Sequence, residues 1–137
     1  QTSVTAFSRA GEVRTQVPVA FRHGGSESQV NLFFHSLRLT GRRFAAGRLL
    51  GDHCSFVAPE RLIPETEAKT SRQQFQRAFA QEFLCPFEAL KEKIQTDHPD
   101  EEDIAKAADH FGVSPLLVRT NLVNKGELDR QALAWTD

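Results

Sequence analysis

Two charged residues one helical turn apart, Arg48 and Asp52, are the first candidates for chemistry in this chain. They lie in the stretch 42–52, where small and apolar residues can bury one side of a helix while arginines stay in water. A helix uses this separation to offer two histidines to zinc in the motif H-E-x-x-H, and Leu49 stands where the motif has its glutamate. Arginine does not lose its proton in proteins, so Arg48 cannot ligate a metal. The residues predict an Arg48–Asp52 pair in place of a metal site.

The stretch 43–52 resembles the R-F-x-x-A-H-E-L-G-H helix of the ImmA/IrrE family of zinc metallopeptidases, and the stretch 79–86 resembles the family's F-A-A-E-F-L-M-P segment. In that family a glutamate on the second helix completes the zinc site, and the matching position here is Gln73. The stretch 104–118 resembles the family's usual ending, so the resemblance spans roughly residues 30–125. The apolar and small residues of these stretches, which would pack in the core, agree with the family pattern. The four chemical positions differ from it: Arg48, Leu49, Asp52 and Gln73.

The resemblance implies an α+β, zincin-like fold with a small sheet, about five helices and a C-terminal helix-turn-helix-like pair. Its expected domains are a zincin-like domain over 1–99, the helical pair over 100–126 packed on it, and a tail over 127–137. Active members of the family cleave repressors and regulators in stress-response and mobile-element pathways. With its chemical positions changed, this chain is expected to be a pseudoenzyme that binds a regulatory protein without a cofactor.

The residues themselves predict the elements that must hold these positions. Weak alternation over 4–22 predicts a hairpin or two short strands, the second an edge because Pro18 crosses it. The strongly apolar run 30–35 predicts a further strand. Helices are expected over 40–52 and 71–84, the second with a stripe of phenylalanines. Pro59 and Pro64 predict that the segment 55–66, between these two helices, is irregular. Three further helices are expected: 87–95, one that begins after Asp100 and ends at Gly112, and one that begins at Pro115 and ends at 124–126.

A zinc site with relocated ligands is the first alternative, because His35, Asp52, His53 and Cys54 are all metal-capable. Neighbouring residues on a helix point about 100° apart, so the consecutive trio 52–54 converges on one ion only if the helix unwinds there. In this alternative the chain would be a metallopeptidase that cleaves a repressor or regulator.

A DNA-binding module through residues 100–125 is the second alternative. The spacing of Ala108, Gly112 and Val118 is that of a helix-turn-helix. The face that would read DNA offers a single arginine, Arg119, and an acidic stretch precedes it. Such a face provides few phosphate contacts, so nucleic acid is the less favoured partner.

The charge of the chain is unevenly distributed although its net value is −1. Residues 1–50 carry seven Arg and two Glu, whereas the remainder carries ten Lys or Arg and sixteen Asp or Glu. The simpler interpretation is that the two parts neutralise each other across the fold, and an acidic partner for the basic part is the alternative. No apolar run is long enough for a membrane span, and two cysteines without a secretory signal indicate reduced thiols. The cytoplasmic location that we expect is implied mainly by the family resemblance. The start at Gln1 suggests that further domains are missing from this sequence.

Overall fold

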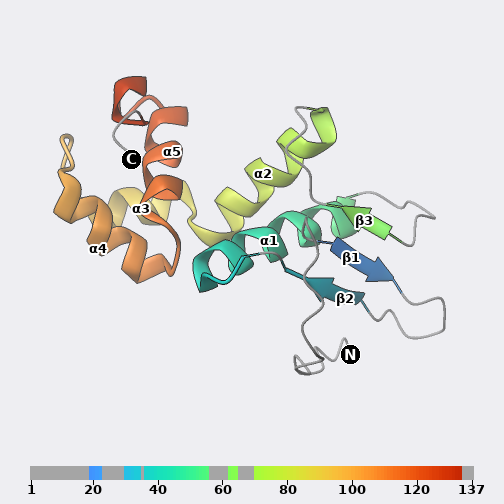
Figure 1. Cartoon of the computed structure of the whole chain (residues 1–137). Coiled ribbons are helices and arrows are strands. Elements are labelled where there is room, and N and C mark those ends of the chain that lie inside the picture. The colour runs from blue at the N-terminus through green and yellow to red at the C-terminus, as the bar shows by residue number, and fades with distance from the viewer. Residues whose placement is uncertain (1–18, 23–29, 35, 56–61, 65–69, 134–137) are drawn as a thin grey trace.

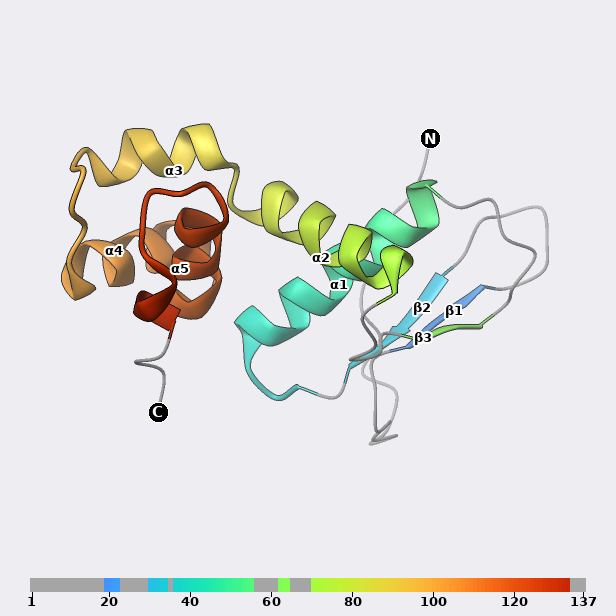
Figure 2. The ribbon, with the colours of Figure 1, turned by 90° about the horizontal axis from the view of Figure 1, so that it is seen from above.

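The structure is a computed structural model, and it describes residues 19–22, 30–34, 36–55, 62–64 and 70–133. Five α-helices dominate: α1 (Leu39–Ser55), α2 (Ser71–Leu84), α3 (Phe87–Ile94), α4 (Glu101–Phe111) and α5 (Pro115–Asn124). A short 3₁₀ helix, η1 (Arg130–Leu133), follows them. The strands β1 (Val19–Arg22), β2 (Val30–Phe33) and β3 (Leu62–Pro64) lie at one end, α3 to α5 at the other, and α1 and α2 between them (Figures 1 and 2).

The three strands form an antiparallel sheet in the order β2-β1-β3. Val19 faces Phe33 of β2 on one side and Pro64 of β3 on the other. The strand that follows Pro18 is therefore central, and the expectation of an edge strand was wrong. Its neighbour β3 also lies within the segment that was expected to be irregular. Strands expected at 4–17 fall outside the described residues.

The expected fold class, an α+β zincin-like domain, is wrong because the described part of the chain is mostly helical. Each strand has only three or four residues. Wherever the structure describes burial, the buried side chains come from helices or from the turns that join them. The physical reason is that short strands expose much backbone and offer few apolar side chains, whereas the helices carry whole apolar faces.

The main hydrophobic core joins α3, α4 and α5. It contains Cys85, Leu90, Ile104, Ala107, Ala108, Val113, Leu117, Val118 and Leu122. Phe44 of α1 and Leu84 of α2 pack against its edge. Helix α3, which precedes the expected boundary at 99/100, thus shares a core with the helices after it, and the division into domains stays a prediction.

Local signals explain the bounds of the C-terminal helices. Asp100 and Asp103 form a capping box at the start of α4, and Gly112 ends that helix with a φ of +63°. Ser114 caps α5, and Pro115 occupies the first turn, where its missing N–H costs nothing. Thr70 rather than Ser71 caps α2, since the Thr70 side chain accepts a hydrogen bond from the backbone N–H of Gln73.

Small residues allow α1 and α2 to approach each other closely. A Cβ atom built on Gly47 would lie 3.1 Å from the Cβ of Ala80, and one built on Gly51 would lie 2.6 Å from the Phe79 ring. The two glycines are four residues apart and hence on one side of α1. They form the part of the α1 surface that packs against α2.

We therefore expect Gly51→Ala to destabilise the protein by about 2 kcal/mol, because the added methyl group forces Phe79 and the α2 backbone away. Gly47→Ala is the control. Its added methyl group would meet Ala80 at a longer distance, so the loss of unfolding free energy should be smaller. Urea unfolding of both variants measures the difference. Equal or reversed losses would contradict the packing described for this crossing.

Candidate functional site

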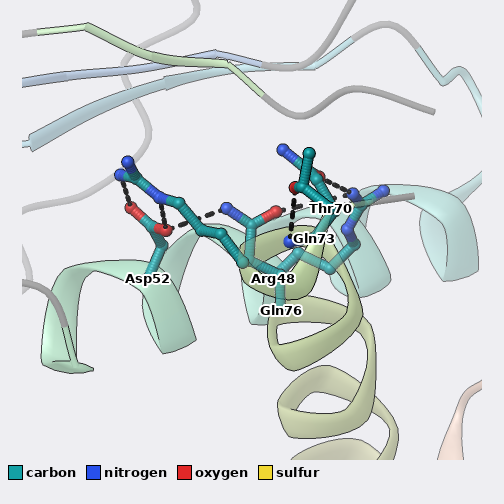
Figure 3. Close-up of polar contacts among 6 residues, drawn as sticks. Arg48, Asp52, Thr70, Gln73 and Gln76 are labelled. Atoms are coloured by element: carbon teal, nitrogen blue, oxygen red, sulfur yellow. Dashed lines mark hydrogen bonds and ion pairs between the residues drawn. The ribbon is translucent and has the colours of Figure 1, made fainter. Parts of the chain in front are cut away.

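A buried polar cluster fills the angle between α1 and α2. Arg48 of α1 donates from Nη2 to Oε1 of Gln73 at 2.6 Å and to Oε1 of Gln76 at 3.5 Å. Gln76 in turn donates from Nε2 to Oδ1 of Asp52 at 2.9 Å. Figure 3 shows these side chains on the side of the two helices past which the strands run. The cluster thus connects two α1 positions to two α2 positions.

Asp52 also receives a bidentate contact from Arg72, at the start of α2. Nε of Arg72 lies 2.5 Å from Oδ1, and Nη2 lies 2.6 Å from Oδ2. Parallel N–H···O bonds of this kind are stronger than neutral hydrogen bonds and fix the relative orientation of both groups. Asp52 is fully buried, whereas the Arg72 side chain is 33% exposed. The ion pair therefore closes the cluster on the side of the solvent.

The cluster is buried although it is polar. Arg48 is 2% exposed, Gln73 is 8% exposed, and Gln76 and Asp52 are not exposed at all. A charged group leaves water only at a cost that its partners must offset, so the loss of one partner here costs more than the loss of one at the surface. The cluster holds the two helices in one register because other registers would separate these partners.

The structure brings together three of the four positions at which the chain departs from the family pattern. Arg48, Asp52 and Gln73 all belong to the cluster, and the fourth, Leu49, is buried beside it on α1 with 1% exposure. Gln76 contacts both Arg48 and Asp52 and so links them. The direct Arg48–Asp52 pairing stays a prediction. Asp52 takes Arg72 as its charged partner, and sequence reasoning missed that residue. The available signal was the spacing of Arg72 and Gln76, which places both on one face of α2.

The residues of the cluster do not fit a zinc ion. Arg48 remains protonated and offers only N–H donors. Both oxygens of Asp52 accept from the Arg72 guanidinium, and Oδ1 also accepts from Gln76. An ion at this place would have to displace a guanidinium from a carboxylate.

The relocated zinc site is likewise not assembled by the described residues. Helix α1 continues through Ser55, so Asp52, His53 and Cys54 keep helical directions. Asp52 is buried, and His53 and Cys54 are exposed. His35 lies outside the described residues. Within the described part of the chain, no group of three metal-capable side chains comes together.

Comparisons with known proteins do not place the chain in a family. No family model matches it, and neither curated proteins nor solved structures give a match. The ImmA/IrrE resemblance therefore stays a prediction that rests on the residues quoted for it.

In the helix-turn-helix-like pair of α4 and α5, the single arginine of the expected DNA-reading face, Arg119, pairs with a residue of the same pair. Arg119 of α5 is only 8% exposed, and its Nη2 is paired with the carboxylate of Glu101 at the start of α4. Thr120, on the same helix, donates its hydroxyl to the carbonyl of Leu116 at 2.7 Å. The arginine that would have read a base edge is thus part of the contact between α4 and α5.

The buried thiol of Cys85 belongs to the core and not to a reactive site. Burial raises the pKa of Cys85 to about 11, so the thiol stays protonated at neutral pH. Asn121 of α5 donates from Nδ2 to the Cys85 carbonyl at 2.8 Å, which ties the α2–α3 turn to α5. Among the helices that the structure describes, none is long and apolar enough to cross a membrane.

Proposed function

We propose that this chain is a non-catalytic binding module for a regulatory protein. The observation that carries the proposal is the engagement of Arg48, Asp52 and Gln73 in one buried cluster. In the family that the sequence resembles, the matching positions hold zinc and the second helix completes the site. Here the same positions form contacts that fasten α1 to α2, which supports a structural use of them.

A role in binding is supported by the surfaces of α1 and α2 that the buried cluster leaves exposed to a partner. The helices α1 and α2 are held rigidly, and preorganised surfaces lose less conformational entropy when a partner binds. The family resemblance suggests that this partner is a regulator in a stress-response or mobile-element pathway. Family members that cut such proteins must first hold them, and the holding function can persist without the ion.

DNA binding is less well supported than protein binding. Base readout by a helix-turn-helix requires side chains that reach the groove, and arginine is the residue that contributes most to it. Arg119 is committed to Glu101, whose carboxylate would also repel phosphates. A metallopeptidase with relocated ligands would require His53 and Cys54 to turn toward Asp52, which the continuous helix opposes.

The proposal is tested by capturing a partner from an extract of the source cells, with and without a chelator. We expect a partner that is recovered at full length and in equal amount under both conditions, because binding requires no metal. The Asp52→Asn variant, assayed in parallel, shows whether an intact cluster is needed to present the surface. Recovery of cleaved fragments that disappear with the chelator would establish a peptidase and overturn the proposal.

A further inference from the structure

The start of α1 carries exposed leucines and arginines side by side. Leu37 and Leu39 are 79% and 72% exposed, more than any other large apolar side chain described as exposed. Arg38 and Arg42 are exposed beside them. We name these four residues the entry patch. Figures 1 and 2 show the start of α1 next to the turn between α4 and α5.

The arginines of the entry patch stand in an unfavourable electrostatic environment. The amide of Arg42 donates to the carbonyl of Arg38 at 3.1 Å, so the two residues are one helical turn apart and face the same way. Like charges at this separation repel each other. They also lie at a helix N-terminus, where the macrodipole disfavours cations, and the first turn of α1 has no acidic residue.

Neither Arg38 nor Arg42 forms an ion pair with a described residue. Arg42 donates from Nε to the Ser36 carbonyl at 2.8 Å and remains exposed. The neighbouring Arg43 differs, because it packs over Gly112 at the C-terminal end of α4, where a cation is favourable. The first two arginines are therefore available to a partner.

We infer that the entry patch docks an acidic amphipathic segment of a partner protein. Carboxylates would pair with Arg38 and Arg42, relieve their mutual repulsion and complement the positive end of α1, while apolar side chains of the segment cover Leu37 and Leu39. The inference rests on the proposed binding role and names the surface and the chemistry of the partner.

An acidic protein segment fits the patch better than a membrane does. Two leucines bury too little apolar area for stable anchoring in a bilayer, which usually needs a lipid chain together with a second signal. Arginine, with its planar fork, recognises carboxylates in a bidentate manner and is enriched in protein interfaces. Isolated exposed leucines are common, but here two of them flank an arginine that forms no ion pair with a described residue.

The test measures binding of the whole chain to three probes: a fluorescein-labelled amphipathic peptide of leucine and glutamate, its leucine–lysine counterpart, and vesicles of phosphatidylserine and phosphatidylcholine. We expect binding of the glutamate peptide alone. The double variant Arg38→Glu/Arg42→Glu and the double variant Leu37→Ser/Leu39→Ser should each weaken it by about tenfold or more. The matched control Lys93→Glu/Lys106→Glu changes the net charge equally at exposed sites on α3 and α4 and should leave binding unchanged.

The inference is overturned if the glutamate peptide binds no better than the lysine peptide, if the control weakens binding as much as the patch variants do, or if the vesicles are the probe that binds. None of these results depends on metal or on proteolysis. A failure here would therefore remove the docking surface and leave the capture of an intact partner as a separate result.

Discussion

Replacing Asp52 by alanine is expected to lower the free energy of unfolding by about 3 kcal/mol, because the change leaves the buried end of the cluster without its carboxylate. Arg72 would lose its bidentate partner and turn to solvent, which limits the loss. Gln76 would lose an acceptor while fully buried, which adds to it. Urea unfolding monitored by circular dichroism measures the change.

Glu102→Ala is the matched control for this prediction. Glu102 pairs with Lys106 one turn along α4, and both side chains are largely exposed. Surface pairs of this kind contribute only about 0.5 kcal/mol. A loss at Asp52 as small as the loss at Glu102 would mean that the cluster does not fasten α1 to α2.

The triple change Arg48→His, Asp52→His and Gln73→Glu is expected to create a zinc site with a Kd on the order of 1 μM. The two histidines would lie one turn apart on α1, and the glutamate would approach from α2, where Gln73 already contacts Arg48. Leu49 is left unchanged because a carboxylate at this buried position would lack a partner. Zinc titration by calorimetry gives the affinity and the stoichiometry.

The double change Arg48→His and Asp52→His, with Gln73 retained, is the control for the triple variant. It supplies two of the three ligands and should bind zinc much more weakly. If the folded triple variant binds no better than the double variant, position 73 is not directed at the same point as positions 48 and 52, and the family register used for the sequence is wrong.

The local elements could be predicted from the sequence because their signals are local. Asp100, Gly112, Ser114 and Pro115 act on the turn in which they stand, and they set the ends of α4 and the start of α5. The meeting of Arg48, Asp52 and Gln73 was predictable for a different reason. The resemblance in the two helices led to the expectation that Gln73 faces Arg48, and the hydrogen bond between these side chains agrees with it.

The fold class and the partners within the cluster were not predictable in the same way. A resemblance in two helices carries little information about the rest of a chain, and here the core lies in α3 to α5. The pairing of Asp52 with Arg72 depends on how α2 crosses α1, and that crossing is set by Gly47 and Gly51. Glycines leave no periodic signal, because their effect appears only when the second helix is in place.

The most direct test of the account is the metal content of the unmodified chain, purified without chelators and examined by native mass spectrometry and elemental analysis. We expect the mass of the polypeptide alone, with zinc well below one equivalent, because the guanidinium of Arg72 and the carboxylate of Asp52 already satisfy each other in the cluster. One tightly held zinc per chain, lost on Asp52→Ala, would contradict the assignment of these residues to a metal-free cluster. It would indicate that they form a metal site of the catalytic kind.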